Sequence, residues 1–320
     1  MHSPRISRRR IRAVAPAAVA TVAGLVASAA CAGDGDADDA ARQAVIDAAP
    51  AAEQRDPLRS GPQGNIAQFI VDCELSHLAY DDPIVLPDEP GLSHLHQFFG
   101  NVEVDADPTY ERVIGADTSC DRARDTASYW APALLDGDGD IVEPLKMTAY
   151  YRPGPGIDPT SVEPYPPSLM MVAGDASAEA AQPIDVVAWS CGTGALRATV
   201  PPDCRDTTDL AARATAEAGS SLRLMITFPD CWDGTSLTSY GTGAHVRYSA
   251  DGACPTEAPV PIPQLQMAID YPAVDPAELT LSSGAIETAH ADFWNVWDQE
   301  KLEEEVRFCL NRDLVCGVAG

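Results

Sequence analysis

The sequence predicts a mainly β protein, an antiparallel β-sandwich or jelly-roll-like fold with long disulfide-stapled loops and a C-terminal helix. Proline is abundant, at 27 residues, and short β-branched or aromatic runs are bounded by Pro, Gly and Asp. Several runs alternate apolar with polar side chains, which is typical of strands with one buried face. The order of the runs does not fit a βαβ repeat. The predicted strands are 66–71, 147–151, 169–172, 186–189, 222–228, 245–248 and 264–271.

The first 31 residues have the pattern of an export signal. An arginine-rich start precedes an apolar, Ala/Val-rich run over 13–30, which lacks the length and bulk of a membrane span. Small residues lead into Cys31, as at a bacterial lipoprotein cleavage site, so we expect Cys31 to carry a lipid. Ordinary cleavage nearby is the alternative. Residues 7–11 also resemble a twin-arginine signal.

The rest of the chain divides into a flexible acidic linker, 32–61, and one β-rich domain, 62–320. Two segments of the domain are predicted to be helical. Residues 209–218 are Ala-rich and short. Residues 295–311 place apolar side chains close to one stripe, with glutamates largely outside it. We expect this last helix to pack on the edge of the sheet, tied down through Cys309.

The nine cysteines fit an exported disulfide protein. With Cys31 set aside as the lipid carrier, eight remain, and eight cysteines allow about 105 pairings. Proximity in the sequence favours short closures and leaves Cys73 with Cys120. No C-x-x-C pair exists, which argues against a zinc–thiolate site. The predicted bridges are Cys73–Cys120, Cys191–Cys204, Cys231–Cys254 and Cys309–Cys316.

The formal net charge of −27 at pH 7 restricts the partners. A strongly acidic protein repels polyanions, so we expect no nucleic acid partner, and membrane contact only through an N-terminal lipid anchor. A solvated acidic surface explains the charge without any charge-driven function. The remaining partner classes are polysaccharide or another small extracellular ligand.

Two histidine motifs are the strongest candidates for a functional site. His94 and His96 are one residue apart, and on a strand such residues point to the same face. His290 and Asp292 have the same spacing. If both pairs face each other, they supply three imidazoles and one carboxylate, a shell suited to a divalent metal ion. His245 could replace one ligand or orient a substrate. A polar cleft without a metal, or core histidines bonded to loop carbonyls, are the alternatives.

The loop over 136–140 resembles the start of a calcium site, with aspartates at alternate positions. It lacks the distal glutamate of an EF-hand. A hairpin turn between Leu135 and Ile141 explains the same glycines and aspartates, and is the favoured interpretation.

Aromatic side chains near acidic and basic groups suggest a substrate-binding groove. Flat rings such as Trp130 and Trp232 can stack on sugars, although scarce tryptophans more often belong to a core. In catalysis without a metal, a His or Tyr base beside Arg247 fits lyase chemistry, whereas paired carboxylates such as Asp233 and Asp292 fit glycoside hydrolysis. No G-x-S-x-G motif supports a serine hydrolase. The predicted substrate-binding residues are Tyr129, Trp130, Trp232, Asp233 and Arg247, and the predicted catalytic residues are His94, His96, His245, His290 and Asp292.

Seven short motifs resemble, in order, those of a family of secreted bacterial and fungal proteins known as a domain of unknown function. They are DPIV at 82–85, SHLHQFFGN at 93–101, SYWAP at 128–132, FPDCWDG at 228–234, HVRY at 245–248, CP at 254–255 and HADFWN at 290–295. Because some fungal members carry carbohydrate-binding modules, the resemblance implies a cell-wall or polysaccharide setting. It implies no particular reaction.

The expected function is therefore that of an exported, envelope-associated protein whose His-rich cleft acts on extracellular or cell-wall polysaccharide. Metal-dependent glycan cleavage is the form we expect if the protein is an enzyme. A non-catalytic glycan- or metal-binding surface lipoprotein is the alternative from a different class.

Overall fold

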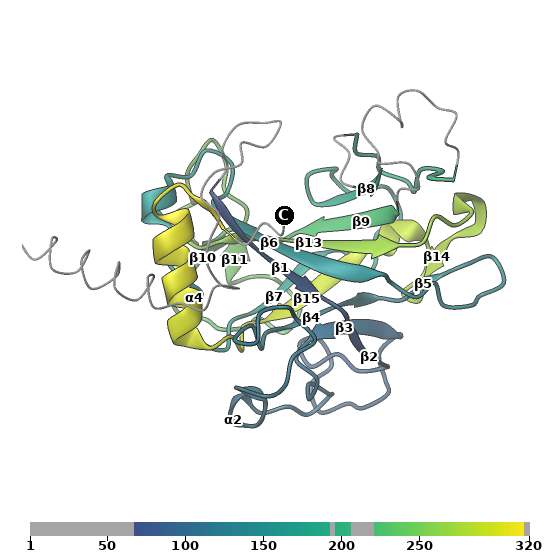
Figure 1. Cartoon of the computed structure of the whole chain (residues 1–320), viewed down its shortest axis with the longest axis horizontal. Coiled ribbons are helices and arrows are strands. Elements are labelled where there is room, and N and C mark those ends of the chain that lie inside the picture. Colours follow the sequence, from purple (N-terminus) through teal and green to yellow (C-terminus); the bar gives the residue numbers. More distant parts are fainter. Residues whose placement is uncertain (1–66, 193–195, 206–220, 317–320) are drawn as a thin grey trace, which may run out of the picture. The chain divides into compact units, whose positions relative to one another are not determined.

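Two large β-sheets, of six and five strands, carry the fold (Figure 1). The computed structural model describes residues 67–192, 196–205 and 221–316. The predicted export signal, Cys31, the linker and the helix over 209–218 lie outside the described residues. Within the described part of the chain, no helix is long and apolar enough to cross a membrane.

The six-stranded sheet is antiparallel except for one short parallel pair at its edge, β1 with β16. Strand β1 alternates half-buried with buried side chains, so Phe69 and Val71 point into the core. The Phe69 ring stacks on the Tyr151 ring of β6, with the ring centroids 4.5 Å apart. In spatial order the strands are β16 (Val315–Cys316), β1 (Gln68–Cys73), β6 (Lys146–Arg152), β13 (Gln264–Tyr271), β9 (Leu222–Thr227) and β8 (Val187–Cys191).

The five-stranded sheet is fully antiparallel and is buried on both faces in its three central strands. Phe99, Tyr129 and Phe293 point to one face and join the core shared with the six-stranded sheet. The alternate residues point to the outer face. In spatial order the strands are β2 (Leu75–Ala79), β3 (His96–Gly100), β4 (Ser128–Pro132), β15 (His290–Trp294) and β7 (Met170–Gly174).

The outer face of the five-stranded sheet has a small core of its own. Phe98, Trp130 and Trp294 pack there against Ile84, Val104 and Val113, which come from the segments that precede and follow β3. The last of these segments includes the short helix α2 (Tyr110–Val113). These segments cover what an isolated sheet would expose to water, which explains why the central strands are buried on both faces.

Shorter elements complete the fold. Strands β10 (Cys231–Trp232), β11 (Val246–Arg247) and β12 (Val260–Pro261) form a three-stranded sheet, and β5 (Leu134–Leu135) pairs with β14 (Thr280–Leu281). All seven predicted runs overlap an observed strand. The 136–140 loop is the predicted hairpin, since the Asp136 carboxylate accepts hydrogen bonds from the Asp138 and Asp140 amides, both at 3.0 Å. Single 3-10 turns lie at Pro159–Ser161, Pro276–Glu278 and Ile286–Thr288.

The C-terminal helix is shorter than the sequence predicts. Helix α4 spans Gln299–Glu305 and continues into a π-helical turn, Val306–Leu310. The prediction of a start at residue 295 is wrong, because the Asn295 amide still bonds to the Leu169 carbonyl at 2.8 Å and so extends β15. The helix begins instead after Asp298, whose side chain caps the Lys301 amide.

All four predicted disulfides are confirmed: Cys73–Cys120, Cys191–Cys204, Cys231–Cys254 and Cys309–Cys316. Cys309 ties the C-terminal π-helical turn to edge strand β16, as expected. Four disulfides indicate an exported or extracellular protein, because the bacterial and eukaryotic cytosol keeps thiols reduced.

Gly174, at the end of β7, cannot be replaced by alanine without strain. Its φ is +84°, and an added Cβ would lie 2.5 Å from the Ala289 carbonyl oxygen and 2.8 Å from the His290 Cα. We expect Gly174→Ala to lower the free energy of unfolding by about 3 kcal/mol, because left-handed strain and overpacking add. Chemical denaturation measures this difference.

Gly139 is the matched control for this substitution. Its φ is +82°, but nothing lies within 4 Å of an added Cβ. Gly139→Ala therefore keeps the strain and omits the clash, with an expected cost of about 1 kcal/mol. Equal losses for the two variants would mean that β7 and β15 are not packed as closely as described.

Candidate metal centre

The sheet register places both histidine motifs on the outer face of the five-stranded sheet. Phe98, Trp130 and Asp292 lie side by side on β3, β4 and β15. Directly paired residues point to the same face, and so do residues two positions apart along a strand. His96 precedes Phe98 by two positions, and His290 precedes Asp292 by two. Both histidines therefore lie on this outer face, at the start of their strands.

Three imidazoles converge there. The ring centroids of His94 and His96 are 4.2 Å apart, those of His94 and His290 are 5.0 Å apart, and those of His96 and His290 are 5.9 Å apart. Each ring offers a nitrogen within 4.8 Å of the others. The sequence argument places His94 and His96 on one strand. In the structure only His96 lies on β3, and His94 belongs to the loop before it, but the two rings are still neighbours.

Backbone carbonyls fix the tautomer of two of these rings. His96 Nδ1 lies 2.8 Å from the Asp81 carbonyl oxygen, and His290 Nδ1 lies 2.8 Å from the Thr288 carbonyl oxygen. A carbonyl only accepts, so each Nδ1 carries the proton and each Nε2 keeps a lone pair. The Nε2 atoms of His94 and His96 are buried without a hydrogen-bond partner among the described residues. Such orientation by carbonyls is what metal-binding histidines require.

Burial keeps the three imidazoles neutral. Burial, together with the neighbouring His290, lowers the pKa of His94 to about 4. Burial also lowers the pKa of His96 well below its usual value, and the other two histidines add to this effect. The pKa of His290 is lowered by burial as well. Neutral imidazole is the form that binds metal ions, so the rings need not lose a proton at neutral pH.

Two buried carboxyl groups adjoin His96. Asp82, His96 and Asp292 form a second group whose possible ligand atoms lie within 4.8 Å of one another. Asp292 is fully buried, and neither of its side-chain oxygens has a hydrogen-bond partner among the described residues. Burial, and then the neighbouring Asp82, raise the pKa of Asp292 well above its usual value. A cation beside His96 would satisfy both carboxyl groups.

Asp82 is the residue of this centre that the sequence-based prediction of the site omits. Its Oδ1 accepts the Ile84 and Val85 amides, at 3.1 and 2.9 Å, and so closes the turn that starts the covering segment. Asp82 opens the DPIV motif, which is the only signal in the sequence that points to it.

The structure brings together four of the predicted catalytic residues and leaves out His245. Both nitrogens of the His245 ring are engaged elsewhere: Nδ1 lies 2.9 Å from Ser239 Oγ, and Nε2 donates to the Met170 carbonyl at 2.8 Å. His245 is not part of either group of potential ligands. Through Nε2, His245 joins its own loop to Met170, the first residue of β7.

Tyr129 and Trp130 do not offer a surface for stacking on a substrate, so these two predictions need correction. Both side chains are 0% exposed. Tyr129 points into the core between the sheets, where its hydroxyl bonds to Asp125 and to Tyr151. Trp130 points to the outer face but is covered, with its ring stacked on Phe98 at 5.3 Å between centroids. Trp130 therefore belongs to the small outer core, where it pairs with Asp292 across β4 and β15.

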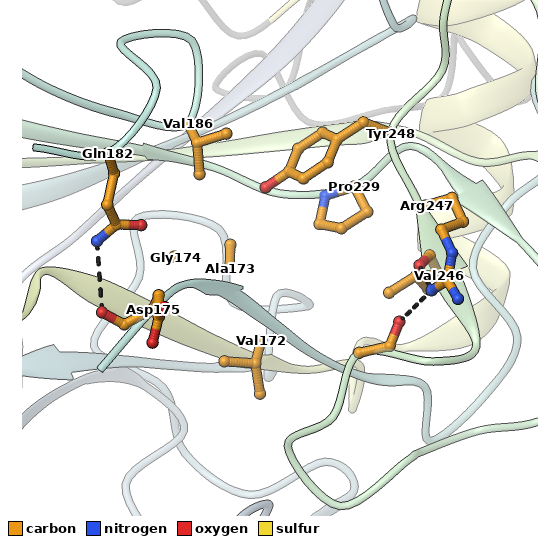
Figure 2. A pocket seen from close by; sticks show the side chains of 11 residues that line it. Val172, Ala173, Gly174, Asp175, Gln182, Val186, Pro229, Val246, Arg247 and Tyr248 are labelled. Atoms are coloured by element: carbon orange, nitrogen blue, oxygen red, sulfur yellow. Dashed lines mark hydrogen bonds between the residues drawn. The ribbon is translucent and has the colours of Figure 1, made fainter. Parts of the chain in front are cut away.

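Of the remaining predicted binding residues, Trp232 and Arg247 lie on the three-stranded sheet, and Asp233 directly follows β10. Trp232 is half-buried, and its Nε1 donates to the Ser236 carbonyl at 2.6 Å. The Asp233 carboxylate accepts the Thr235 and Ser236 amides, at 2.7 and 2.8 Å, and so stabilises its own turn. Arg247 instead lines a pocket beside β7, which Figure 2 shows from close by.

The fold and the site define a disulfide-stapled β-sandwich protein with three convergent histidines, of which His96 and His290 are buried and His94 is half-buried. Comparison with known families then places the chain. It belongs to the family described as Domain of unknown function (DUF1996), whose model matches residues 82–297. The match includes all three histidines, Asp82 and Asp292. No curated protein and no solved structure matches the chain.

Proposed function

We propose that this protein holds a divalent metal ion through the Nε2 atoms of His94, His96 and His290. The supporting observation is that the three rings each offer a nitrogen within 4.8 Å of the others, while carbonyl bonds at Nδ1 of His96 and His290 leave Nε2 as the atom with the lone pair. Imidazole ligands suit zinc, copper, nickel and iron, whereas calcium and magnesium prefer oxygen. Zinc is the expected ion because three protein ligands with an open fourth position are its usual catalytic arrangement.

The proposed centre is suited to hydrolytic chemistry. A bound zinc ion supplies Lewis-acid activation of water or of a polarised oxygen. The chain adds two carboxyl groups next to His96, those of Asp82 and Asp292, which can hold or release a proton beside the metal. Asp292, which the spacing of the motif predicts as a ligand, lies beside His96 and not within the group of three histidines, so the fourth position stays open.

We further propose that the protein is exported, held at the envelope by a lipid on Cys31, and acts on extracellular or cell-wall polysaccharide. The four disulfides and the acidic composition support export. The polysaccharide setting rests on the family resemblance. One observation favours the second candidate, a non-catalytic metal- or glycan-binding surface lipoprotein: the aromatic rings expected to stack on a sugar, Tyr129 and Trp130, are fully buried.

Metal analysis of the protein purified without a histidine tag tests the proposed centre. We expect about one transition-metal ion per chain, retained through gel filtration, because three convergent neutral imidazoles bind such ions tightly. Plasma mass spectrometry measures the content and identity of the metal. Protein that stays metal-free after incubation with zinc, copper, nickel and iron salts would refute the centre.

A polysaccharide screen separates the two candidate functions. The metal-loaded wild type is expected to release reducing ends from at least one wall polysaccharide, and the double variant His94→Ala/His96→Ala to release none while keeping the circular dichroism spectrum of the wild type. Binding of a polysaccharide without cleavage would support the non-catalytic candidate. Failure to bind or cleave any tested polysaccharide would reject both glycan assignments for those polymers.

A further inference from the structure

A pocket of about 330 Å³ lies along the outer edge of β7, on the side away from the other strands of its sheet (Figure 2). Val172, Ala173 and Gly174 of β7 form one wall, and Val186 and Tyr248 lie opposite. Its volume is at the lower end of the range for small-ligand sites. Gly174 pairs with His290 across β7 and β15, so the pocket is one strand away from the histidine cluster.

The backbone of β7 has free hydrogen-bonding groups on this edge. The Leu169 carbonyl accepts the Asn295 amide on the β15 side, whereas the Met170 amide donates to the Leu237 carbonyl on the other side. Peptide groups in an antiparallel strand alternate between the two sides, so those of Val172 and Gly174 also point outward. Among the described residues, none forms a hydrogen bond to Val172 or Gly174 on this edge.

Opposite charges mark the two ends of the pocket (Figure 2). At one end, Arg247 uses Nη1 to donate to the Gly243 and Val246 carbonyls, at 2.8 and 2.7 Å. No carboxylate of the described residues lies within ion-pair distance of its guanidinium, although the chain has 48 acidic residues. At the other end, Asp175 directly follows Gly174 and is exposed.

The space between these charges suits an extended backbone. His245, two residues before Arg247, donates to the Met170 carbonyl, so the free outward-pointing groups run from Val172 to Gly174. Three strand residues cover about 10 Å. Pro229 and Val246 line the pocket between its charged ends with apolar surface.

We propose that this pocket binds a short peptide of about three residues, which adds to β7 as an antiparallel strand. Its C-terminal carboxylate meets Arg247, its main chain pairs with Val172 and Gly174, and its ammonium group meets Asp175. A peptide of three extended residues spans about 10 Å, which matches the length of the free edge. Addition of a strand to an open sheet edge is an established mode of peptide recognition, with affinity supplied by main-chain hydrogen bonds. A ligand without net charge also avoids repulsion by the acidic protein.

Trialanine with free ends is the probe that tests the proposal. Titration into nitrogen-15-labelled protein is expected to shift the amide resonances of Val172 and Gly174. Trialanine amide, which lacks the carboxylate, is expected to bind at least about tenfold more weakly, because one charge-assisted hydrogen-bonded contact is lost. N-methylation of the central residue of the peptide should weaken binding in the same way, because it removes a main-chain donor. These changes are made in the ligand, so they leave the folding of the protein untouched.

Variants assign the ends of the peptide. Arg247→Met should remove the preference for the free carboxylate, and Asp175→Asn should remove the preference for the free ammonium group over an acetylated one. Equal affinity of the wild type for trialanine and its amide would overturn the proposal. The absence of any resonance shift at millimolar trialanine would also overturn it. Shifts at Val172 and Gly174 that glucuronate causes and trialanine does not would overturn it too, because the pocket would then select a sugar acid.

Discussion

His290→Ala is expected to weaken zinc binding by at least about 100-fold, more than the roughly 10–100-fold that loss of an outer-shell partner costs. The ring of His290 is one of three that offer a nitrogen within 4.8 Å of the others, and its Nδ1 bond to the Thr288 carbonyl holds Nε2 in place. Two imidazoles alone leave the ion without the third ligand that defines the site. Competition with a chromogenic chelator measures the change in Kd.

His245→Ala is the matched control, because it also removes a buried histidine with a lowered pKa. Both nitrogens of that ring bond to Ser239 and Met170, so the zinc affinity should stay within about twofold of the wild-type value. If the His245 variant lost zinc as strongly as the His290 variant, the assignment of the ligands would be wrong. Thermal unfolding of both metal-free variants identifies any loss that comes from misfolding.

The histidine cluster illustrates what residue spacing can and cannot predict. The i, i+2 spacing of His94 with His96, and of His290 with Asp292, predicts that each pair lies on one side of its backbone, and the pairing of β3 and β15 with β4 then brings the two pairs together. The Asp81 and Thr288 carbonyls that orient the rings are backbone atoms, so no side-chain motif identifies them. Asp82 is equally hidden, because a loop residue shows no periodicity that would place it against a particular strand.

Burial explains why three strands of the five-stranded sheet are not among the predicted runs, and why two aromatic residues were assigned to a binding groove. The alternation of apolar and polar residues identifies β9 and β13, which belong to the six-stranded sheet. It fails for β3, β4 and β15, where nearly every side chain is buried, because a second layer of loops covers their outer face. The same layer buries Trp130, and the main core buries Tyr129. A sequence does not reveal whether such a ring faces a groove or a covering loop.

The short disulfides were predictable for a simple physical reason. Cys309 and Cys316 are 7 residues apart, and Cys191 and Cys204 are 13 apart, so each loop closes at a small entropic cost. Cys73 and Cys120 are 47 residues apart, and their pairing could be predicted only because the other six cysteines had already been assigned to bridges. Their pairing joins β1 of the six-stranded sheet to the segment between β3 and β4.

Asp125→Asn is expected to change how stability depends on pH. The Asp125 side chain is fully buried between the sheets, and burial raises its pKa to about 8. In the unfolded chain the pKa of an aspartate is about 3.9. Unfolding between these values therefore releases a proton, so the free energy of unfolding of the wild type falls as the pH rises from about 4 to about 8. Asparagine cannot titrate and lacks this contribution. As the pH rises across this range, the free energy of unfolding of the variant should increase relative to that of the wild type by an amount on the order of 5 kcal/mol.

Urea unfolding at pH values from 4 to 9 measures the difference, and Tyr129→Phe provides the control. The Tyr129 hydroxyl donates to Asp125 Oδ2 at 2.7 Å and so favours the carboxylate form. Its removal should raise the pKa of Asp125 further and extend the fall in stability above pH 8, whereas Asp125→Asn removes that fall. Parallel pH profiles for the wild type and the Asp125 variant would mean that this carboxyl group is ionised in the folded protein at neutral pH. The buried chain of hydrogen bonds through Tyr129, Tyr151 and Trp297 would then surround a charge.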